Sequence, residues 1–253
     1  DIKENDRKLY FINYISVYST YLINNPDVIY FYYFYEPKGI WWERLKSIPN
    51  LKIEKIVLPT HIGNKEISDT KSKVEWIKIN TLYKRGGIYL DLNTICLKPW
   101  KDLSNKDVIL EKIFPDNISN SFMFTKPKSE FLKLWLDKYK SNFNHNEWEK
   151  ISITLPKKIA REYPDLIELR DCDLFFLPHH RKVQKIFVEN GEIPSHLSYL
   201  HLCDTSSGKY LEGIKDWYWA YQNKHTIYGK ILIHLLNNFI FSQSNYYLAH
   251  KEH

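Results

Sequence analysis

The sequence predicts an α/β protein in which helices flank a mostly parallel central sheet. Helical and strand patterns alternate over residues 11–58, and a second helical pattern over residues 71–84 leads through a pair of glycines into a short apolar strand at 88–90. Alternating strands and helices build βαβ units, which produce parallel sheets. Because no glycine- or proline-rich linker interrupts the chain, we expect a single domain over residues 1–253.

The first part of the chain is expected to alternate between helix and strand. Residues 11–24 have a helical pattern that ends before Pro26, and residues 28–35 form a long aromatic run typical of a strand. A short helix at 41–47 and a strand at 51–58 follow. This order supplies the strand, helix and strand of a βαβ unit.

The next helix is predicted over residues 71–84. Its apolar residues fall near helical spacing, and Glu75 and Lys78, three residues apart, share its polar face. The helix should end at Gly86, because glycine tolerates the left-handed conformation that ends many helices. Gly87 then allows the backbone to pass close to a neighbouring segment or a ligand.

The strand that follows the glycines places polar oxygens at its carboxyl end. Residues 88–90 have the continuous apolar pattern of a buried strand, and Asp91 follows directly. In open α/β folds, ligands bind at the carboxyl edge of the sheet. Mg²⁺ and Mn²⁺ prefer oxygen ligands and reach phosphates through one or two carboxylates, which Asp91 and Asn93 can provide. The alternative is a hairpin turn stabilised by side-chain to backbone bonds.

After residue 99 the predicted elements are less regular. Residues 117–125 are expected to form a strand with a polar entry, and residues 131–139 and 151–163 have amphipathic helical patterns. A short strand is expected at 174–177, and the His-His-Arg run at 179–181 is interpreted as a polar loop.

The final predicted helix, over residues 227–241, is almost continuously apolar. At about 15 residues it is shorter than the roughly 20 that a membrane span needs. We expect it to pack across the sheet, with attachment to a membrane surface as the alternative. Trp217 and Trp219 precede it and are candidates for stacking on an acceptor sugar, although core packing is the commoner role of such residues.

Composition limits the range of functions. The chain has 36 Lys and Arg against 30 Asp and Glu, and its net charge of +6 is spread along the sequence. This balance suits an anionic ligand or a membrane surface, and many ordinary solvated proteins share it. No nucleic-acid-binding motif is present, so no nucleic-acid partner is expected. Cys96, Cys172 and Cys203 make neither a disulfide framework nor a Cys-x-x-Cys zinc site.

The stretch LYKRGGIYLDLNTICLKP over residues 82–99 resembles the glycosyltransferase family with an Asp-x-Asp sugar-binding region. This family includes mannosyl-, galactosyl- and N-acetylglucosaminyl-transferases of GT-A type. The core of the resemblance covers residues 73–104. It implies a GT-A-like nucleotide-sugar-binding fold and a metal-dependent, retaining transfer of a hexose or N-acetylhexosamine. The donor would be a UDP-sugar or GDP-sugar used with Mn²⁺ or Mg²⁺, and the acceptor a glycan, protein or lipid.

Three positions depart from the family pattern. The second metal-binding Asp of the motif is Asn93 here, an upstream helix Asp is Glu75, and an Arg three residues later is Lys78. Asn93 still offers a carbonyl oxygen but no charge, so the affinity for a divalent ion should fall. Lys78 neutralises phosphate as a point charge, without the two-pronged geometry of Arg.

A second stretch, residues 199–207, matches the downstream part of the family. There a His returns to the metal and diphosphate before a polar loop that closes over the donor, and His201 is the residue in that position. A hydrogen-bonded structural His is the alternative. The family also has an Asn-Ser pair corresponding to Asn120 and Ser121, which is expected to contact the donor sugar unless the pair forms a turn.

The resemblance therefore implies a set of site residues: Asp91 and Lys78 as catalytic residues, Glu75, Gly87, Tyr89, Asp91, Asn120 and Ser207 as donor-binding residues, and Asp91, Asn93 and His201 as metal ligands. A non-catalytic nucleotide-sugar or carbohydrate-binding module on a degenerate transferase fold is the alternative function. A glycoside hydrolase would need paired carboxylates across a sugar, and no such pair can be located in the sequence.

The amino terminus and the cellular location are open at this point. A strand normally opens the GT-A-like fold, whereas residues 1–6 are polar, so either that strand was trimmed or the pocket is incomplete. The cytoplasm is the expected location of the chain as given, and the Golgi lumen if an anchor was trimmed. The abundance of Lys, Ile, Asn, Tyr and Phe fits a viral or microbial source. Membrane association has no supporting motif.

Overall fold

The structure is a computed structural model of the chain, and its contacts divide the chain into two compact units. It describes residues 7–100, 103, 106–113, 117–142, 149–171, 183–202 and 204–249. The first unit consists of Asp1–Lys55, Leu92–Trp100 and Asp173–His253, and the second of Ile56–Asp91 and Lys101–Cys172. The single domain expected over residues 1–253 stays a prediction.

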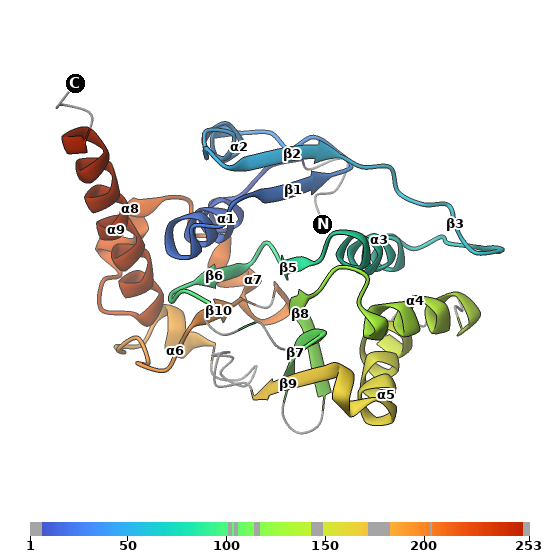
Figure 1. Ribbon diagram of the computed structural model, residues 1–253. Helices are drawn as coiled ribbons and strands as arrows, with labels where there is room; N and C mark the ends of the chain where they lie inside the picture. Colours follow the sequence, from blue (N-terminus) through green and yellow to red (C-terminus); the bar gives the residue numbers. More distant parts are fainter. Residues whose placement is uncertain are drawn as a thin grey trace. The chain divides into compact units, whose positions relative to one another are not determined.

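The first unit is built around a parallel pair of strands, β1 and β2, which lie in register from Ile29 opposite Leu51 to Tyr33 opposite Lys55. Helices α1 and α2 lie beside this pair (Figure 1). The short strands β6 and β10 form a separate antiparallel pair. The elements of this unit are α1 (Phe11–Asn24), β1 (Ile29–Tyr33), α2 (Ile40–Leu45), β2 (Leu51–Lys55), β6 (Thr94–Cys96), α6 (Gln184–Phe187), β10 (Tyr199–His201), α7 (Asp204–Leu211), α8 (Trp217–Gln222) and α9 (Ile227–Ala249).

Aromatic side chains and the last helix form the core of the first unit. Trp217 packs edge-on against Phe11 with ring centroids 5.2 Å apart, and Trp219 packs against Tyr228 at 5.7 Å. Both tryptophans therefore contribute to core packing. Helix α9 contributes three completely buried residues to the same core: Ile231, Leu232 and Leu235. None of the helices in the described residues is long and apolar enough to cross a membrane.

The second unit contains a four-stranded sheet in the order β5-β8-β7-β9. The pairs β5–β8 and β8–β7 are antiparallel, and β7–β9 is parallel. In Figure 1, α4 and α5 lie side by side next to these strands. The elements are β3 (His61–Ile62), β4 (Lys65–Glu66), α3 (Thr70–Arg85), β5 (Gly87–Leu90), β7 (Val108–Ile113), β8 (Asn117–Thr125), α4 (Glu130–Asn142), a π-helical turn (Lys150–Thr154), α5 (Leu155–Glu162), a 3-10 turn (Pro164–Leu166) and β9 (Ile167–Asp171).

The predicted α/β class is confirmed, and the sheet differs in its strand directions. It is small and mixed rather than mostly parallel. The physical reason is the short link between β7 and β8, because antiparallel neighbours need only a hairpin whereas parallel neighbours need a long crossover. The predicted helix at 151–163 begins as a π-helical turn. The strand expected at 174–177 and the loop at 179–181 lie outside the described residues.

A β-bulge in the β7–β8 pairing shapes the sheet where the candidate site residues lie. Leu110 pairs with Met123, but the next residue, Glu111, pairs with Ser119. Residues 120–122 of β8 therefore have no partner in β7, while Phe122 still pairs with Leu90 of β5. Bulges bend a strand and change where its side chains point, and they are common beside functional sites.

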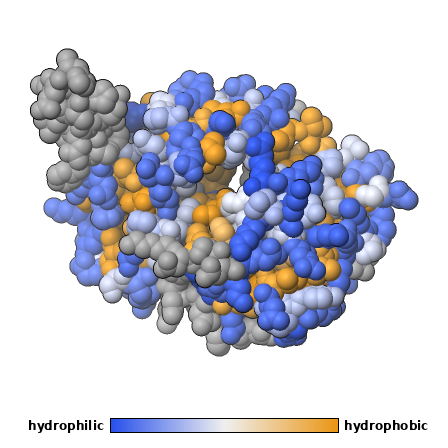
Figure 2. All heavy atoms as spheres, in the orientation of Figure 1, coloured by the Kyte–Doolittle hydropathy of each residue, from blue (hydrophilic) through white to orange (hydrophobic). Residues whose placement is uncertain are grey.

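Side chains from three helices fill the core of the second unit. Trp135 and Tyr139 of α4 are fully buried, and each has a hydrogen-bonded polar end. The Trp135 indole donates to the carbonyl of Ile151 at 3.0 Å, and the Tyr139 hydroxyl donates to the carbonyl of Ser72 at 3.1 Å. These bonds satisfy polar groups that would otherwise be buried at a cost. Most of the surface that Figure 2 shows is hydrophilic, with hydrophobic residues in smaller patches.

Glu111 is one of the buried polar residues without such a partner in the described part of the chain. Its side chain is 1% exposed, and neither carboxylate oxygen has a hydrogen-bond partner within the described part of the chain. Arg170, its register partner on β9, instead donates to Glu168 at 2.6 Å. Burial raises the pKa of Glu111 from 4.5 to about 8. The folded protein therefore holds this proton more tightly than the unfolded chain does.

Replacing Glu111 should change how stability depends on pH. With a raised folded-state pKa, the stability contribution of this carboxyl is complete below about pH 4.5 and is lost as the pH rises to about 8. Between these limits the unfolding free energy of the wild type should fall by about 2–4 kcal/mol. Glu111→Gln removes the titrating group. Over the same pH range, the free energy of unfolding of this variant, measured in urea, should therefore fall by about 2–4 kcal/mol less than that of the wild type.

Glu130→Gln is the control, because Glu130 is an exposed carboxylate on α4. Its pH profile should match that of the wild type. Equal slopes for the wild type and Glu111→Gln between pH 5 and pH 8 would show that Glu111 does not titrate as its burial implies.

Candidate functional site

Helix α3 is held at both ends by local hydrogen bonds. The Asp69 side chain caps its start by accepting from the backbone N–H of Ser72 at 2.8 Å. The backbone N–H of Gly86 closes its end by donating to the carbonyl of Leu82 at 2.7 Å. Gly86 has a φ of +66°, and a Cβ there would lie 2.6 Å from the backbone nitrogen of Pro127. The predicted glycine stop is confirmed, and only glycine fits it.

Glu75 and Lys78 form a buried ion pair on this helix. Their charged groups lie 2.8 Å apart, and the residues are 4% and 8% exposed. The sequence pattern placed them on the polar face of the helix, and that face turns out to be buried. The Asn120 side-chain amide donates to Glu75 at 3.0 Å, and Lys78 donates to the backbone carbonyl of Asn120 at 3.2 Å. Asn120 therefore satisfies both partners of the pair.

The contacts of Lys78 extend to the end of β5. Its ammonium group lies 4.8 Å from the centre of the Tyr89 ring, within cation–π distance. The Tyr89 hydroxyl donates to Asp91 Oδ1 at 2.6 Å, and the Asp91 backbone N–H donates to the carbonyl of Ser121 at 3.0 Å. We call the connected residues Glu75, Lys78, Tyr89, Asp91 and Asn120 the buried polar cluster.

The electrostatics of the buried polar cluster keep Tyr89 protonated. Burial, and then the charge and hydrogen bond of Asp91, raise the pKa of Tyr89 well above its ordinary value of 10.0. Tyr89 therefore remains a hydrogen-bond donor to Asp91 at physiological pH. Burial also raises the pKa of Glu75, which the charge and hydrogen bond of Lys78 oppose. The cluster holds Asp91, which is half-buried, as an oriented carboxylate at the carboxyl end of β5.

Gly87 lies at the other end of the same strand. It opens β5 with a φ of +99° and is exposed, and a Cβ there would meet nothing within 4 Å. Glycine is required here by the backbone angle rather than by space. At about 3.3 Å per residue, Gly87 is roughly 13 Å from Asp91 along the strand. The structure thus groups four of the predicted donor-binding residues, Glu75, Tyr89, Asp91 and Asn120, and separates Gly87 from them.

Asn93 and His201, which lie far apart in the sequence, are brought together in the first unit. His201 pairs with Thr94 across the β6–β10 ladder, and the backbone N–H of Leu202 donates to the carbonyl of Asn93 at 2.9 Å. Both candidate metal ligands are half-buried. Ser207 lies in α7 and is 2% exposed.

Sequence reasoning missed two residues that position these segments. Asn13 of α1 donates to the carbonyl of Leu92 at 3.1 Å and so anchors the turn that carries Asn93. The carbonyl of Ser152 accepts a 3.4 Å hydrogen bond from Asn120. Both hydrogen bonds join segments far apart in the sequence, and in each of them the acceptor is a backbone carbonyl. Because every residue has such a carbonyl, no sequence pattern indicates these contacts.

Asp91 of the second unit and Asn93 of the first each carry an oxygen donor of the kind that suits a divalent ion bound with a diphosphate. A carboxylate and an amide carbonyl are hard ligands of the kind that Mg²⁺ and Mn²⁺ take beside phosphate and water. Within the described residues, no group of three or more His, Cys, Asp or Glu could hold a metal ion.

The chain is similar to three kinds of known protein: a family, a curated relative and a solved structure. A family model described as "Glycosyltransferase sugar-binding region containing DXD motif" matches residues 14–115. Glucan organizing enzyme 1 of Cryptococcus neoformans var. grubii is 26% identical over 189 residues, which cover 70% of this chain and 51% of that protein. The chain thus spans about half the length of this curated relative. PaToxG Glycosyltransferase, a solved structure, covers 62% of this chain and 65% of its own with a TM-score of 0.41 and 14% identity.

The chain is an α/β protein that is similar to this glycosyltransferase family over residues 14–115. The matched residues include the stretch at 82–99, so the predicted resemblance is confirmed. The family match is consistent with the glycosyl-transfer role that the resemblance implies.

Breaking the buried ion pair should destabilise the protein strongly. Lys78→Met leaves the Glu75 carboxylate buried without its counter-charge, so the unfolding free energy should fall by about 3–5 kcal/mol. The matched control is Lys140→Met. Lys140 pairs with Asp137 at the same i,i+3 spacing, 3.7 Å apart and half exposed, so this change should cost about 1 kcal/mol or less.

Urea unfolding followed by circular dichroism measures both variants. Similar losses in Lys78→Met and Lys140→Met would contradict the role given to the buried pair.

Proposed function

We propose that the protein is a metal-dependent, retaining glycosyltransferase. It transfers a hexose or N-acetylhexosamine from a UDP- or GDP-sugar to a glycan, protein or lipid acceptor. The observation that supports this function most is the oriented carboxylate of Asp91 at the carboxyl end of β5, held by the Tyr89 hydroxyl at 2.6 Å. Such an edge is where α/β folds bind nucleotides.

Each candidate residue has a role in this proposal. Asp91 binds the divalent ion and the donor ribose, and Asn93 and His201 complete the contacts to the ion and diphosphate. Ser207 and Gly87 belong to the donor-binding segments predicted from the family. These assignments rest on the sequence resemblance and on the donor chemistry of the side chains.

Lys78 acts by positioning other groups. The resemblance implies that it offsets phosphate charge directly, but the residue is 8% exposed and its ammonium group is already bound to Glu75 and to the Asn120 carbonyl. Its positive charge stabilises Glu75 and packs over the Tyr89 ring. Glu75 is 4% exposed and bound to Lys78 and Asn120, so it also acts by positioning. The half-buried Asn120, which donates to Glu75 at 3.0 Å, faces the sugar hydroxyls of the donor.

The chemistry needs charge stabilisation more than a protein base. When bound, a divalent ion stabilises the negative charge that develops on the departing diphosphate. In a transfer that retains anomeric configuration on one face of the sugar, the leaving phosphate oxygen accepts the proton of the acceptor hydroxyl. The chain's own groups then orient the donor and keep Asp91 in place.

The second candidate function is a non-catalytic nucleotide-sugar or carbohydrate-binding module. Asn93 favours it, because an amide in place of the second Asp of the motif removes one negative charge from the metal site. The two functions differ in turnover, since a module binds the sugar nucleotide and leaves it intact.

Replacing Asp91 should abolish turnover without unfolding the protein. With UDP- and GDP-sugars as donors, transfer or donor hydrolysis should require Mn²⁺ or Mg²⁺ and stop with EDTA. Asp91→Asn should lower kcat/KM by at least about 100-fold, because it removes the charge that holds the ion. Asp137→Asn, which changes an exposed carboxylate on α4, should leave kcat/KM unchanged.

Calorimetry with the same donors separates the two functions. If the donor binds only with metal, if Asp91→Asn weakens this binding, and if no turnover is detected, the protein is the non-catalytic binding module. Full activity in Asp91→Asn, or no donor binding with or without Mn²⁺, would overturn the proposal.

Replacing Tyr89 should weaken metal binding while sparing the fold. Tyr89→Phe keeps the ring beneath Lys78 and removes the hydroxyl that donates to Asp91. Loss of such a supporting hydrogen bond typically costs 10- to 100-fold in metal affinity, so the Kd for Mn²⁺ in the presence of a sugar nucleotide should rise by about tenfold or more.

Tyr163→Phe is the control, because the Tyr163 side chain is exposed just after α5. Isothermal titration gives both affinities. An unchanged Mn²⁺ affinity in Tyr89→Phe would show that the hydrogen bond from the Tyr89 hydroxyl does not support metal binding by Asp91.

A further inference from the structure

Glu111 is a buried carboxyl group that the proposed function does not use. It lies on β7 where the pairing with β8 shifts at the β-bulge, and its partner on β8 is Ser119. The residue is 1% exposed, and neither carboxyl oxygen has a hydrogen-bond partner in the described part of the chain. Because an unpaired charge is costly to bury, such a carboxyl is stable only in its neutral form. Ionisation of Glu111 in the folded protein therefore requires a change around it.

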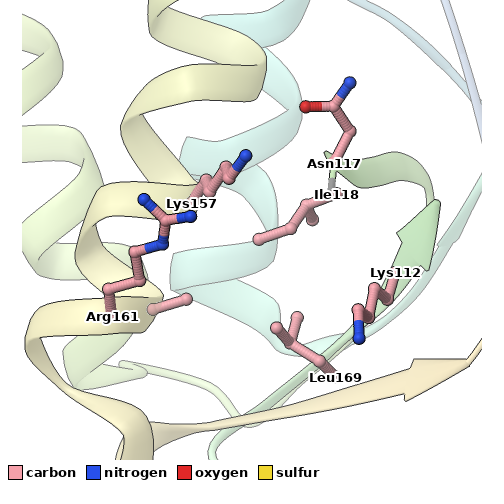
Figure 3. A pocket seen from close by; sticks show the side chains of 7 residues that line it. Lys112, Asn117, Ile118, Lys157, Arg161 and Leu169 are labelled. Carbon is pink, nitrogen blue, oxygen red and sulfur yellow. The ribbon is translucent and has the colours of Figure 1, made fainter. Parts of the chain in front are cut away.

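The charged residues on the neighbouring strands do not offset this cost. Strand β7 pairs with β8 and β9, and the residues opposite Glu111 are Ser119 and Arg170. The Arg170 side chain donates to Glu168 at 2.6 Å. Lys112, the next residue of β7, lies on the other face of the strand, where it lines a cavity beside α5 (Figure 3). Burial alone raises the pKa of Glu111, so no nearby charge in the described chain favours its ionised form.

The hydroxyl group of Ser119, opposite Glu111, holds the β-bulge in shape. It accepts from the backbone N–H of Ser121 at 3.2 Å, and the hydroxyl oxygens of the two serines lie 2.6 Å apart. Both serines are buried. The residue between them, Asn120, donates to Glu75 on α3 at 3.0 Å. The bulge opposite Glu111 is therefore fixed by hydrogen bonds that do not include Glu111.

The same bulge supports the candidate site. The carbonyl of Ser121 accepts from the backbone N–H of Asp91 at 3.0 Å. Asn120 bonds to both partners of the buried ion pair. The β7–β8 pairing is interrupted here, because residues 120–122 have no partner on β7. A shift of residues 119–121 therefore moves the supports of Asp91 and of the ion pair together.

We propose that Glu111 is a positioning residue of the donor site, whose protonated carboxyl keeps the β-bulge closed and whose ionised carboxylate opens it. In the closed bulge, the hydrogen bonds that join Ser119, Ser121 and Asp91 are intact. No donor among the described residues reaches the carboxyl group, so its ionised form is stabilised only when β8 shifts or water enters beside it. The released proton passes to solvent. As the pH rises toward about 8, Asp91 and Asn120 lose their fixed supports.

Opening of the bulge weakens metal and donor binding at alkaline pH. In the proposed function Asp91 binds the divalent ion, and its backbone loses the bond to the Ser121 carbonyl when the bulge opens. This effect on binding rests on the proposed transferase function. The coupling between Glu111 and the bulge does not rest on it, because it is measured in the protein without metal or donor.

The test measures hydrogen exchange of single backbone amides in the full chain, corrected for the intrinsic exchange rate at each pH. The Asp91 amide reports on the bulge, because it donates to the Ser121 carbonyl. Since the opening that exposes this amide also exposes Glu111, its protection in the wild type should fall by about tenfold per pH unit between pH 5 and pH 7. Glu111→Gln and Glu111→Leu remove the titrating group, so protection of the Asp91 amide should stay constant over this range in both variants. Circular dichroism confirms that each variant is folded.

The Lys126 amide is the internal control, because it donates to the Asp107 carbonyl at the far end of the same β7–β8 pair. Its protection should change much less with pH than that of the Asp91 amide. Glu130→Gln removes an exposed carboxylate and should keep the pH dependence of the wild type.

Equal pH dependence at the Asp91 and Lys126 amides would mean that Glu111 acts on the stability of the whole unit, and it would overturn the proposal. Constant protection of the Asp91 amide in the wild type, or a pH dependence that persists in Glu111→Gln and Glu111→Leu, would overturn it as well. Coupling of Glu111 to the Asp91 amide in a protein that binds no sugar nucleotide would support the positioning role and contradict the transferase function alone.

Discussion

The ion pair between Glu75 and Lys78 is the interaction on which the candidate site depends. Removing two charges from water costs several kcal/mol per ion, and their attraction repays this cost only if hydrogen bonds satisfy the remaining groups. Asn120 provides these bonds, because its amide donates to Glu75 and its carbonyl accepts from Lys78. Asn120 reaches both groups from the β-bulge in β8, where residues 120–122 leave the β7 ladder. Helix α3 and the irregular part of the sheet therefore stabilise each other.

The charge of Lys78 also connects this ion pair to Asp91, the residue with the clearest chemical role. Lys78 lies over the ring of Tyr89, and the Tyr89 hydroxyl donates to Asp91. Because burial and the charge of Asp91 raise the pKa of Tyr89, its hydroxyl remains a donor. The orientation of a half-buried carboxylate at a strand end thus follows from a buried cluster behind it. Catalytic groups held by packed neighbours of this kind keep their geometry better than groups on an unsupported loop.

The sequence predicted what depends on local pattern. Helix α3, the glycine that ends it and the strand end at Asp91 follow from helical spacing and from the φ of Gly86, all of which are local. The burial of Glu75 and Lys78 could not be predicted in the same way, because two opposite charges three residues apart look alike on an exposed and on a buried helix face. The bulge and the mixed sheet depend on pairing between strands far apart in the sequence, which no local pattern specifies.

A crystal structure of the protein with Mn²⁺ and a UDP- or GDP-sugar tests the central claim most directly, because the anomalous signal of manganese locates the ion independently of the protein. The account predicts a manganese peak within coordination distance of the Asp91 carboxylate, the donor diphosphate on the same ion, and an unbroken hydrogen bond from Tyr89 to Asp91. A sugar nucleotide bound elsewhere, or a manganese ion with ligands that exclude Asp91, would contradict it.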